Sequence, residues 1–468
     1  MRRYHLVTFG CQMNQHDSDR LRGVLDEAGF APAEGLETAD LVLLNTCSVR
    51  EKAEQKLRSE VGRIGLLKRE RPGLMIAVAG CVAQQEGERL VKKMPQIDVV
   101  IGPDQAAALP RLLAEVEHGG LPQVRTSFDV DEPRFLSAAF GASATRVSDF
   151  VTIMKGCDER CTFCVVPITR GPERYRPSDE ILNEIEHLVA RGARELTLLG
   201  QTVDSYTDPQ HRLERPQTDG PAIRSARGRV RRDESEFPAL LRAIAAHVPQ
   251  LGRLRYTSPH PRHLTTALIE AHRDLPVLAK HVHMPVQSGS DRVLKRMLRR
   301  YDIAEYRERV TALRRAVPGL TLSTDIIVAF PGETEEEYQA TLGLVRRVRF
   351  DDAFLYRYSP REGTPAMRLP AEQFVSDEVG QTRLEGLIEL HRSIQAEIYQ
   401  SEVGSTVEVL VEKEGRRGGV QGRTESNKVV NFPGDPSLIG SFVDVRLTST
   451  TGATFAGELI TERVERVA

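Results

Sequence analysis

The sequence predicts an α/β protein of three parts: an N-terminal doubly wound parallel α/β domain, a central partial (β/α)6 barrel and a small all-β C-terminal domain. Three observations lead there. Apolar strand-like runs alternate with helical stretches through residues 1–118, and again through 149–400. In residues 401–468, glycine-rich turns separate short β-rich runs. A chain of 468 residues has room for about three domains.

The first part has strand-like runs at 4–9, 41–45, 74–79 and 99–101, and helical stretches at 17–28, 48–68 and 85–94. Three of these strands end at a cysteine: Cys11, Cys47 and Cys81. Because the carboxyl ends of parallel strands form the ligand crevice of such a sheet, we expect the three thiols to converge on one point. Three buried, purely structural cysteines are the alternative.

Residues 119–148 contain Gly, Pro and acidic residues and look like a linker. Six β/α units follow in 149–400, which indicates an open barrel rather than a closed eight-stranded one. The segment 211–232 is rich in arginine and lacks periodicity. We interpret it as an insertion that is either a solvated loop or a contact to RNA phosphates. The expected strands are 150–155, 195–199, 253–257, 281–286, 321–329 and 353–358, and a long helix is expected over 371–400.

The last part has strand-like runs at 405–412, 429–432, 441–448 and 454–460, which predict a small β-barrel. It holds eight Lys+Arg against ten Asp+Glu, so its composition alone does not predict RNA binding. The whole chain is also balanced, with 64 Lys+Arg, 66 Asp+Glu and a formal net charge of −2. Attraction to RNA would therefore have to come from local patches.

The six cysteines carry the strongest functional signal. The basic start MRRYHLVTFGCQ lacks a signal-peptide core, and no apolar run approaches the ~18 residues that span a bilayer. We therefore expect a cytoplasmic protein without a membrane partner. Thiols stay reduced in that compartment, so the cysteines indicate metal binding or catalysis rather than disulfides.

Cys157, Cys161 and Cys164 form a C-x3-C-x2-C motif directly after a predicted strand. Three thiolates on one short loop can hold three irons of a 4Fe–4S cube. No fourth cysteine lies nearby, so one iron stays open, as a catalytic metal centre requires. Structural zinc does not fit, because it needs a fourth protein ligand and no histidine follows at a suitable spacing.

This motif, with Phe163 before its last cysteine, resembles the radical S-adenosylmethionine superfamily. The likeness extends over nearly the whole chain to the methylthiotransferases, whose C-terminal TRAM domain is OB-like and associated with RNA binding. The matching segments are GCQMN (10–14), NTC (45–47), GC (80–81), CTFCVVPITRG (161–171), SPHP (258–261), MPVQSGSDRVLKRM (284–297), DIIVAFPGETEEEY (325–338), YSPREGTPA (358–366) and GRTESNKVVNF (422–432).

The resemblance implies two 4Fe–4S clusters and S-adenosylmethionine as cofactors. A cluster on Cys157, Cys161 and Cys164 would bind S-adenosylmethionine at its open iron and yield a 5′-deoxyadenosyl radical. An auxiliary cluster on the other three cysteines would carry the sulfur on its own open iron. The partners implied are a tRNA substrate, an external electron donor and a sulfur source. No side-chain acid or base is needed at the reacting carbon, so we assign no catalytic residue.

Within the family, SVREKA (48–53) and VVNF (429–432) resemble the MiaB-type tRNA enzymes. That likeness implies insertion of a methylthio group at C2 of N6-isopentenyl(dimethylallyl)adenosine at tRNA position 37, giving 2-methylthio-N6-dimethylallyladenosine. The segment GQTVD (200–204) departs at two positions from the Gly-Gln-Asn-Val-Asn expected there, and the arginine-rich insertion is unusual. Both departures concern substrate contacts rather than the cysteines.

Polar residues and glycine at the predicted barrel-strand ends are candidates for binding S-adenosylmethionine, because that face of a barrel holds the ligand. Ordinary loop polarity is the alternative. Arg170 and Arg174 are candidates for a tRNA phosphate contact or for solvated charge. We expect a monomer. The cofactor-binding candidates, with the aromatic residue of the cysteine loop, are Phe163, Gly200, Gln201, Ser258, Gln287 and Asp325.

Two alternatives stay open. The same chemistry could act on N6-threonylcarbamoyladenosine of tRNA or on an aspartate of a ribosomal protein. A different class is a non-catalytic iron–sulfur electron carrier or RNA-binding scaffold, which predicts that the reduced protein would not cleave S-adenosylmethionine.

Overall fold

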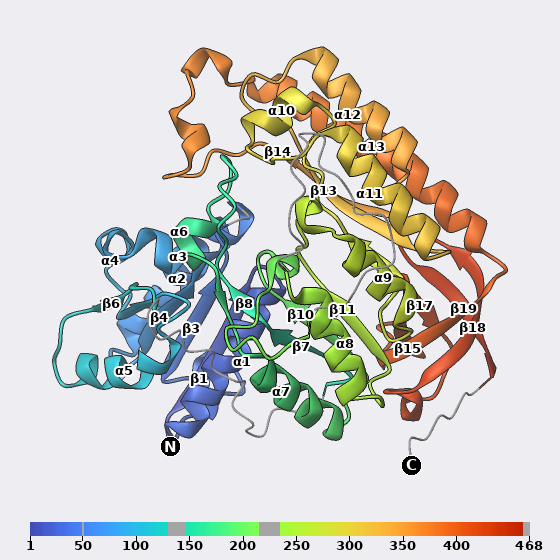
Figure 1. Cartoon of the computed structure of the whole chain (residues 1–468). Coiled ribbons are helices and arrows are strands. Elements are labelled where there is room, and N and C mark those ends of the chain that lie inside the picture. Colours follow the sequence, from blue (N-terminus) through green and yellow to red (C-terminus); the bar gives the residue numbers. More distant parts are fainter. Residues whose placement is uncertain (49–50, 130–145, 215–234, 462–468) are drawn as a thin grey trace.

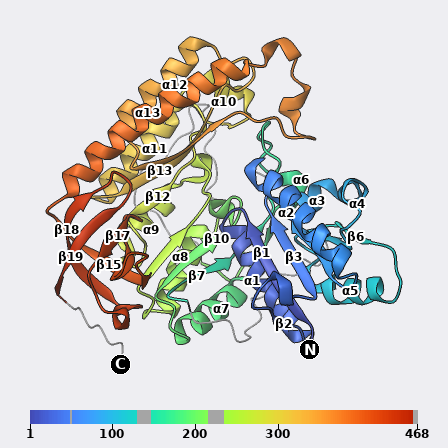
Figure 2. The ribbon, with the colours of Figure 1, turned by 180° about the vertical axis from the view of Figure 1, so that it is seen from behind.

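The computed structural model describes residues 1–48, 51–129, 146–214 and 235–461. Figure 1 shows the N-terminal unit in blue on one side, the central barrel in green and yellow, and the C-terminal β-barrel in red on the other side. The view from behind shows the same order (Figure 2). Most of the predicted arginine-rich insertion, and part of the predicted linker, lie outside the described residues.

The N-terminal unit is a six-stranded parallel sheet in the order β2-β1-β3-β4-β5-β6. Alternate residues of its central strands pack into two core clusters, with α1 and α5 on one face and α2 to α4 on the other. The predicted doubly wound α/β fold is therefore confirmed. The strands are β1 Arg3–Phe9, β2 Ala31–Pro32, β3 Leu41–Thr46, β4 Met75–Gly80, β5 Val99–Ile101 and β6 Gln123–Arg125; the helices are α1 Gln12–Glu27, α2 Glu51–Glu70, α3 Cys81–Glu86, α4 Glu88–Lys93 and α5 Leu109–Glu117.

Two helices begin earlier than the sequence predicted. α1 begins right after Cys11, which occupies the N-cap position with extended backbone. The helix predicted over 85–94 begins at Cys81 instead and is divided by Gly87, whose φ is +52°. The third difference is β6, which joins the sheet from within the stretch predicted as a linker. Two of the three N-terminal cysteines thus lie at helix starts.

The central barrel consists of two three-stranded parallel sheets, β7-β10-β11 and β12-β13-β14. A parallel bridge between Leu254 and Leu278 connects them. Six strands in an open arrangement confirm the partial barrel. The strands are β7 Ser148–Thr152, β10 Glu195–Leu199, β11 Arg253–Tyr256, β12 His281–His283, β13 Thr321–Val328 and β14 Asp352–Arg357, with a short pair β8 Met154–Lys155 and β9 Arg174–Tyr175; the helices are α6 Val166–Arg170, α7 Ser178–Ala190, α8 Phe237–His247, α9 Thr266–Asp274, α10 Asp291–Arg296, α11 Ile303–Ala316, α12 Glu335–Val348 and α13 Asp377–Glu402.

The C-terminal unit is a closed barrel in the order β15-β16-β17-β19-β18. β16 was not predicted from the sequence because its one glycine, Gly422, was assigned to a turn. A Cβ on Gly422, within β16, would lie 2.2 Å from the carbonyl oxygen of Leu410, so glycine here allows the two strands to approach. The strands are β15 Thr406–Glu414, β16 Val420–Thr424, β17 Val429–Phe432, β18 Phe442–Thr450 and β19 Phe455–Thr461.

The small barrel packs against the amino-terminal ends of the central strands. Arg253, the first residue of β11, pairs with Glu408 at 3.2 Å, and its guanidinium carbon lies 5.0 Å from the centre of the Phe442 ring. Lys428 pairs with Asp351, which precedes β14, at 3.1 Å. The carboxyl ends of the central strands lie at the opposite end of the barrel, away from these contacts with the small barrel.

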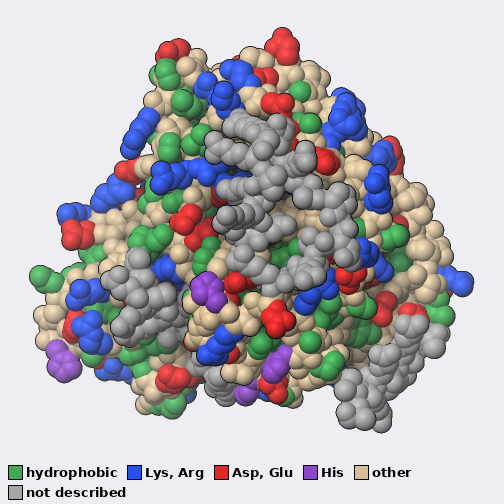
Figure 3. All heavy atoms as spheres, in the orientation of Figure 1, with side chains coloured by type: hydrophobic (Ala, Val, Ile, Leu, Met, Phe, Trp, Pro, Cys, Tyr) green, Lys and Arg blue, Asp and Glu red, His purple; other side chains and the backbone are tan. Residues whose placement is uncertain are grey.

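The visible surface has no segregated charge: basic and acidic side chains are interspersed over it (Figure 3). Among the helices of the described ranges, none combines the length and apolar character needed to cross a membrane.

Candidate active site

Cys157, Cys161 and Cys164, here called the loop triad, follow β8 on a turn that requires glycine. A Cβ on Gly156 would lie 1.9 Å from the carbonyl oxygen of Pro172, and the φ of this glycine is +81°. Cys161 is buried, whereas the other two are partly exposed. The loop therefore presents its sulfur atoms to a cavity while its backbone is fixed against the following turn.

The loop triad lines a cavity of about 170 Å³ at the carboxyl ends of the barrel strands. Five of the six predicted cofactor-binding residues line the same cavity: Phe163, Gln201, Ser258, Gln287 and Asp325. The sixth, Gly200, is not among the lining residues; its Cβ position lies 2.4 Å from Met154, so it serves close packing. Further polar and charged residues that were not predicted from the sequence also line the cavity: Glu159, Thr202, His260, His283 and Arg299.

The backbone at the rim of this cavity is strained in two places. Ser258 has a φ of +57° and Gln287 has a φ of +70°, and neither is glycine. Such conformations persist when the surroundings impose them, and they concentrate at ligand sites. The side-chain oxygen Oε1 of Gln287 is buried and has no hydrogen-bond partner. An unpartnered acceptor in this cavity fits a ligand that donates hydrogen bonds, such as the amino group of S-adenosylmethionine.

The sulfur atoms of the loop triad have close polar neighbours. The hydroxyl Oγ1 of Thr202 lies 3.0 Å from Sγ of Cys157, and Nη1 of Arg299 donates to Sγ of Cys161 at 3.4 Å. Burial raises the pKa of Cys157 and of Cys164 to about 12. Without a bound cation these two cysteines therefore stay thiols, and a metal would displace their protons on binding.

Cys11, Cys47 and Cys81, here called the auxiliary triad, converge as the sequence predicted. A Cβ on Gly10 would lie 2.6 Å from Cβ of Cys47, so the two turns are in contact. A hydrogen bond with Cys47 lowers the pKa of Cys11 to about 6. No three His, Cys, Asp or Glu side chains of the described chain surround a single-ion position. The cysteines of a 4Fe–4S cube bind different irons, so a triad that holds such a cluster need not surround a single-ion position.

One arginine connects the two triads. Arg170 lies at the end of α6, which begins directly after the loop triad. Its Nε donates to Sγ of Cys81 at 3.3 Å, and its Nη2 pairs with Asp17 of α1 at 2.6 Å. Arg174 is also buried and pairs with Asp104. The prediction that these two arginines contact tRNA phosphate or solvent is wrong, because both are enclosed between the N-terminal unit and the barrel.

Comparisons with known proteins fit this arrangement. Three family models match: "Uncharacterized protein family UPF0004" over residues 3–102, "Radical SAM superfamily" over 151–345 and "TRAM domain" over 400–460. A tRNA-2-methylthio-N(6)-dimethylallyladenosine synthase of Sorangium cellulosum is 55% identical and covers 98% of this chain and 93% of its own length. One of Neisseria meningitidis serogroup B is 42% identical and covers 98% and 100%.

The chain belongs to the tRNA-2-methylthio-N(6)-dimethylallyladenosine synthase family. It is therefore a radical S-adenosylmethionine methylthiotransferase, as the motifs predicted, and membership implies a 4Fe–4S cluster and S-adenosylmethionine. Among solved structures, the radical S-adenosylmethionine methyltransferase TsrM of Kitasatospora setae superposes with a TM-score of 0.54 at 13% identity, over 84% of this chain and 89% of that one. That similarity concerns the fold alone.

Proposed function

We propose that this enzyme places a methylthio group on C2 of N6-dimethylallyladenosine at position 37 of tRNA, giving 2-methylthio-N6-dimethylallyladenosine. The shared name of relatives at 42% and 55% identity supports this substrate. The observation that carries the chemistry is the bond between Arg170, on the helix that follows the loop triad, and Cys81 of the auxiliary triad. That bond connects the auxiliary triad to the helix that follows the loop triad, which supports a common role for the two triads.

The two triads have separate roles in this proposal. Cys157, Cys161 and Cys164 hold the cluster that binds S-adenosylmethionine, and the auxiliary triad holds a second 4Fe–4S cluster. When bound, the clusters and S-adenosylmethionine supply the radical and the sulfur. The chain itself binds these groups, orients them and encloses the site. The strained turns at Ser258 and Gln287 fix polar groups at the cavity rim.

The remaining residues of the cavity position S-adenosylmethionine. Gln201 accepts a hydrogen bond from the backbone N–H of Gly156 at 2.6 Å, which ties the end of β10 to the cysteine loop. His283 and Asp325 contact each other at 3.4 Å beside the free acceptor of Gln287. These groups would orient the amino and carboxylate ends of the cofactor, while Phe163 closes the side of the cavity nearest the cluster. An external reductant, a sulfur source and tRNA in the cytoplasm complete the system, in which the enzyme acts as a monomer.

The substrate is tested by mass spectrometry of tRNA nucleosides from a strain that lacks this gene. Loss of the methylthio nucleoside with accumulation of N6-dimethylallyladenosine is expected, and the wild-type gene should restore it. A normal methylthio level in that strain would overturn the substrate proposal. Loss of a methylthio group from threonylcarbamoyladenosine instead would reassign the substrate.

The second cluster is tested by iron analysis of anaerobically purified protein. We expect about eight irons per chain in the wild type and about four after Cys11, Cys47 and Cys81 are all changed to alanine. That variant should still cleave S-adenosylmethionine when reduced, because the loop triad is intact. About four irons in the wild-type protein would rule out the auxiliary cluster.

A further inference from the structure

Two exposed aromatic side chains lie on one face of β14: Phe354 and Tyr356, here called the aromatic pair. They are 45% and 38% exposed, and every other Phe or Tyr of the described ranges is less exposed. β14 is an edge strand, since β13 is its only partner among the described strands. Exposed apolar residues that lie together, unlike single ones, indicate a contact surface, and aromatic residues dominate such surfaces.

The aromatic pair continues one wall of the cofactor cavity. Phe354 lies opposite Asp325 of β13, and Asp325 lines the cavity. The ring of Phe354 also meets the ring of His283, another lining residue, edge to face with 5.8 Å between ring centres. Leu355, between the two aromatic residues, packs into the main core on the other side of the sheet. Since side chains alternate along a strand, Tyr356 lies on the cavity side with Phe354.

Apolar side chains connect the aromatic pair with the cysteine loop. Ile327 lies opposite Tyr356 in the sheet and packs, partly buried, against the same apolar cluster as Phe163. Phe163 lies between Cys161 and Cys164 and lines the cavity. A flat apolar group on the aromatic pair would therefore lie beside the cavity that holds the cofactor in the proposed function.

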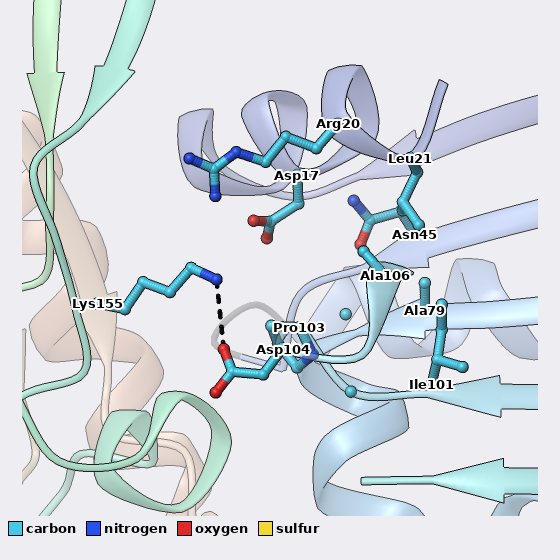
Figure 4. Close-up of a pocket in the computed structure, with 12 residues that line it drawn as sticks. Asp17, Arg20, Leu21, Asn45, Ala79, Ile101, Pro103, Asp104, Ala106 and Lys155 are labelled. Carbon is cyan, nitrogen blue, oxygen red and sulfur yellow. Dashed lines mark hydrogen bonds and ion pairs between the residues drawn. The ribbon is translucent and has the colours of Figure 1, made fainter. Parts of the chain in front are cut away.

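The other edge strand of the barrel, β7, is covered by the N-terminal unit. Oγ1 of Thr152, the last residue of β7, lies 2.9 Å from Nδ1 of His16 in α1. Just beyond, Lys155 of β8 pairs with Asp104 at 3.3 Å (Figure 4). The cavity left between these described residues has a volume of about 20 Å³, which holds a water molecule but not a base. A nucleotide therefore fits at the β14 edge and not here.

The chemistry of the substrate matches this surface. Enzymes that act on a base take it out of its stack and hold it against aromatic or apolar side chains. Bases of RNA loops are bound in the same way. We propose that Phe354 and Tyr356 form the surface on which the adenine ring of the substrate nucleotide stacks, beside the cofactor cavity. This inference rests on the proposed function, which supplies the base.

The test uses the reduced holoenzyme and an anticodon stem-loop RNA that carries N6-dimethylallyladenosine at position 37. Phe354→Leu keeps an apolar side chain but removes the ring, so the KM for this RNA should rise about tenfold or more. Phe354→Tyr keeps a ring and should stay close to the wild type. Leu66→Ala removes a still more exposed apolar side chain from α2 and is the control that should leave the KM unchanged. A wild-type KM in Phe354→Leu would overturn the stacking surface.

A fluorescent base measures the stacking directly. 2-Aminopurine at position 37 of the RNA loses fluorescence when it stacks, and the chain contains no tryptophan that would interfere. The wild type and Phe354→Tyr should quench the probe more strongly than Phe354→Leu. Equal quenching by all three proteins would overturn the inference. So would a tenfold slower cleavage of S-adenosylmethionine by Phe354→Leu without RNA, because the ring would then belong to the cofactor site.

The same assay separates this inference from the proposed function. If the wild-type enzyme adds no methylthio group to the RNA, the proposed function fails, and with it the base that the aromatic pair is inferred to bind. If the wild-type enzyme does add the group and Phe354→Leu has an unchanged KM, the proposed function holds and only the stacking surface fails.

Discussion

Each cysteine triad has one buried arginine that donates a hydrogen bond to one of its sulfur atoms. Arg170 donates to Cys81 and Arg299 donates to Cys161. A hydrogen bond and a positive charge beside a cluster thiolate favour the more negative, reduced cluster, and therefore raise its reduction potential. Sequence patterns do not reveal these contacts, because the arginine and the cysteine come from distant parts of the chain.

Changing Arg170 to Gln should lower the reduction potential of the auxiliary cluster and reduce methylthio transfer by about tenfold or more. Cleavage of S-adenosylmethionine should be retained, because the loop triad keeps its own arginine. The measurement is a redox titration followed by electron paramagnetic resonance, with Arg170→Lys as the conservative variant that restores part of the potential. An unchanged potential in both variants would contradict the tuning role.

Asp204 links one departure from the family motif to a pH dependence. It is buried, accepts from the backbone N–H of His260 at 2.9 Å, and its other oxygen has no partner. Burial raises the pKa of Asp204 to about 7. The folded state thus holds the proton to higher pH than the unfolded state, whose carboxyl has lost it above about pH 4. Stability from this group is lost as the pH rises through 7.

Asp204→Asn should remove that dependence, because an amide does not titrate. The wild type should lose about 1 kcal/mol of unfolding free energy between pH 6 and pH 8 through this group, and the variant should not. Denaturant unfolding of the anaerobic protein at both pH values measures the difference. If the free energy of unfolding changes equally between pH 6 and pH 8 in the wild type and the variant, Asp204 is already ionised in the folded protein at pH 6.

At the scale of the elements, the turns that carry the auxiliary triad depend on glycine. Gly80 ends β4 with a φ of +93°, and a Cβ there would lie 2.6 Å from the carbonyl oxygen of Thr46. The backbone of β3 cannot move away from this position without displacing Cys47. The glycine before Cys81 is therefore required by the close packing of two neighbouring strands, β3 and β4.

Gly80→Ala should destabilise the protein by about 2–4 kcal/mol and lower the iron content toward that of a single cluster. Gly62→Ala in the helix α2 is the matched control, since nothing lies within 4 Å of its Cβ position. That control should keep both clusters and the wild-type stability or slightly more. Iron analysis and thermal unfolding provide the readouts. Full iron content in Gly80→Ala would contradict the tight packing of this turn.

The same elements show how much of the fold can be predicted from sequence patterns. The strands Val99–Ile101, Glu195–Leu199 and Val429–Phe432 were predicted to the residue, because each is a short apolar or β-branched run between turn residues. β16 was missed because Gly422, which allows β15 and β16 to approach closely, was assigned to a turn. The convergence of the auxiliary triad followed from parallel topology, whereas the burial of Arg170 and Arg174 depends on how two domains pack.

At the scale of the whole molecule, the cysteine cavity and the small barrel lie at opposite ends of the central strands. The contacts of the small barrel are with strand starts, such as Arg253 and Asp351, and the cavity is at strand ends. An RNA that reaches both units must therefore run along the side of the central barrel. The position of the small barrel then sets where the rest of the RNA is held relative to the reacting base.

Phe442→Ala should loosen that docking, because the ring stacks on Arg253 and fills the space above Gly252, whose Cβ position lies 2.4 Å from it. We expect faster proteolysis between α13 and β15, unchanged iron content and unchanged cleavage of S-adenosylmethionine. Affinity for tRNA should fall by about tenfold or more, because two RNA-contacting units held at a fixed separation bind more tightly than two independent ones. Ile460→Ala, at an exposed position of β19, is the control that should change none of these. If Phe442→Ala is cleaved faster but binds tRNA as tightly as the control, the small barrel does not position the RNA.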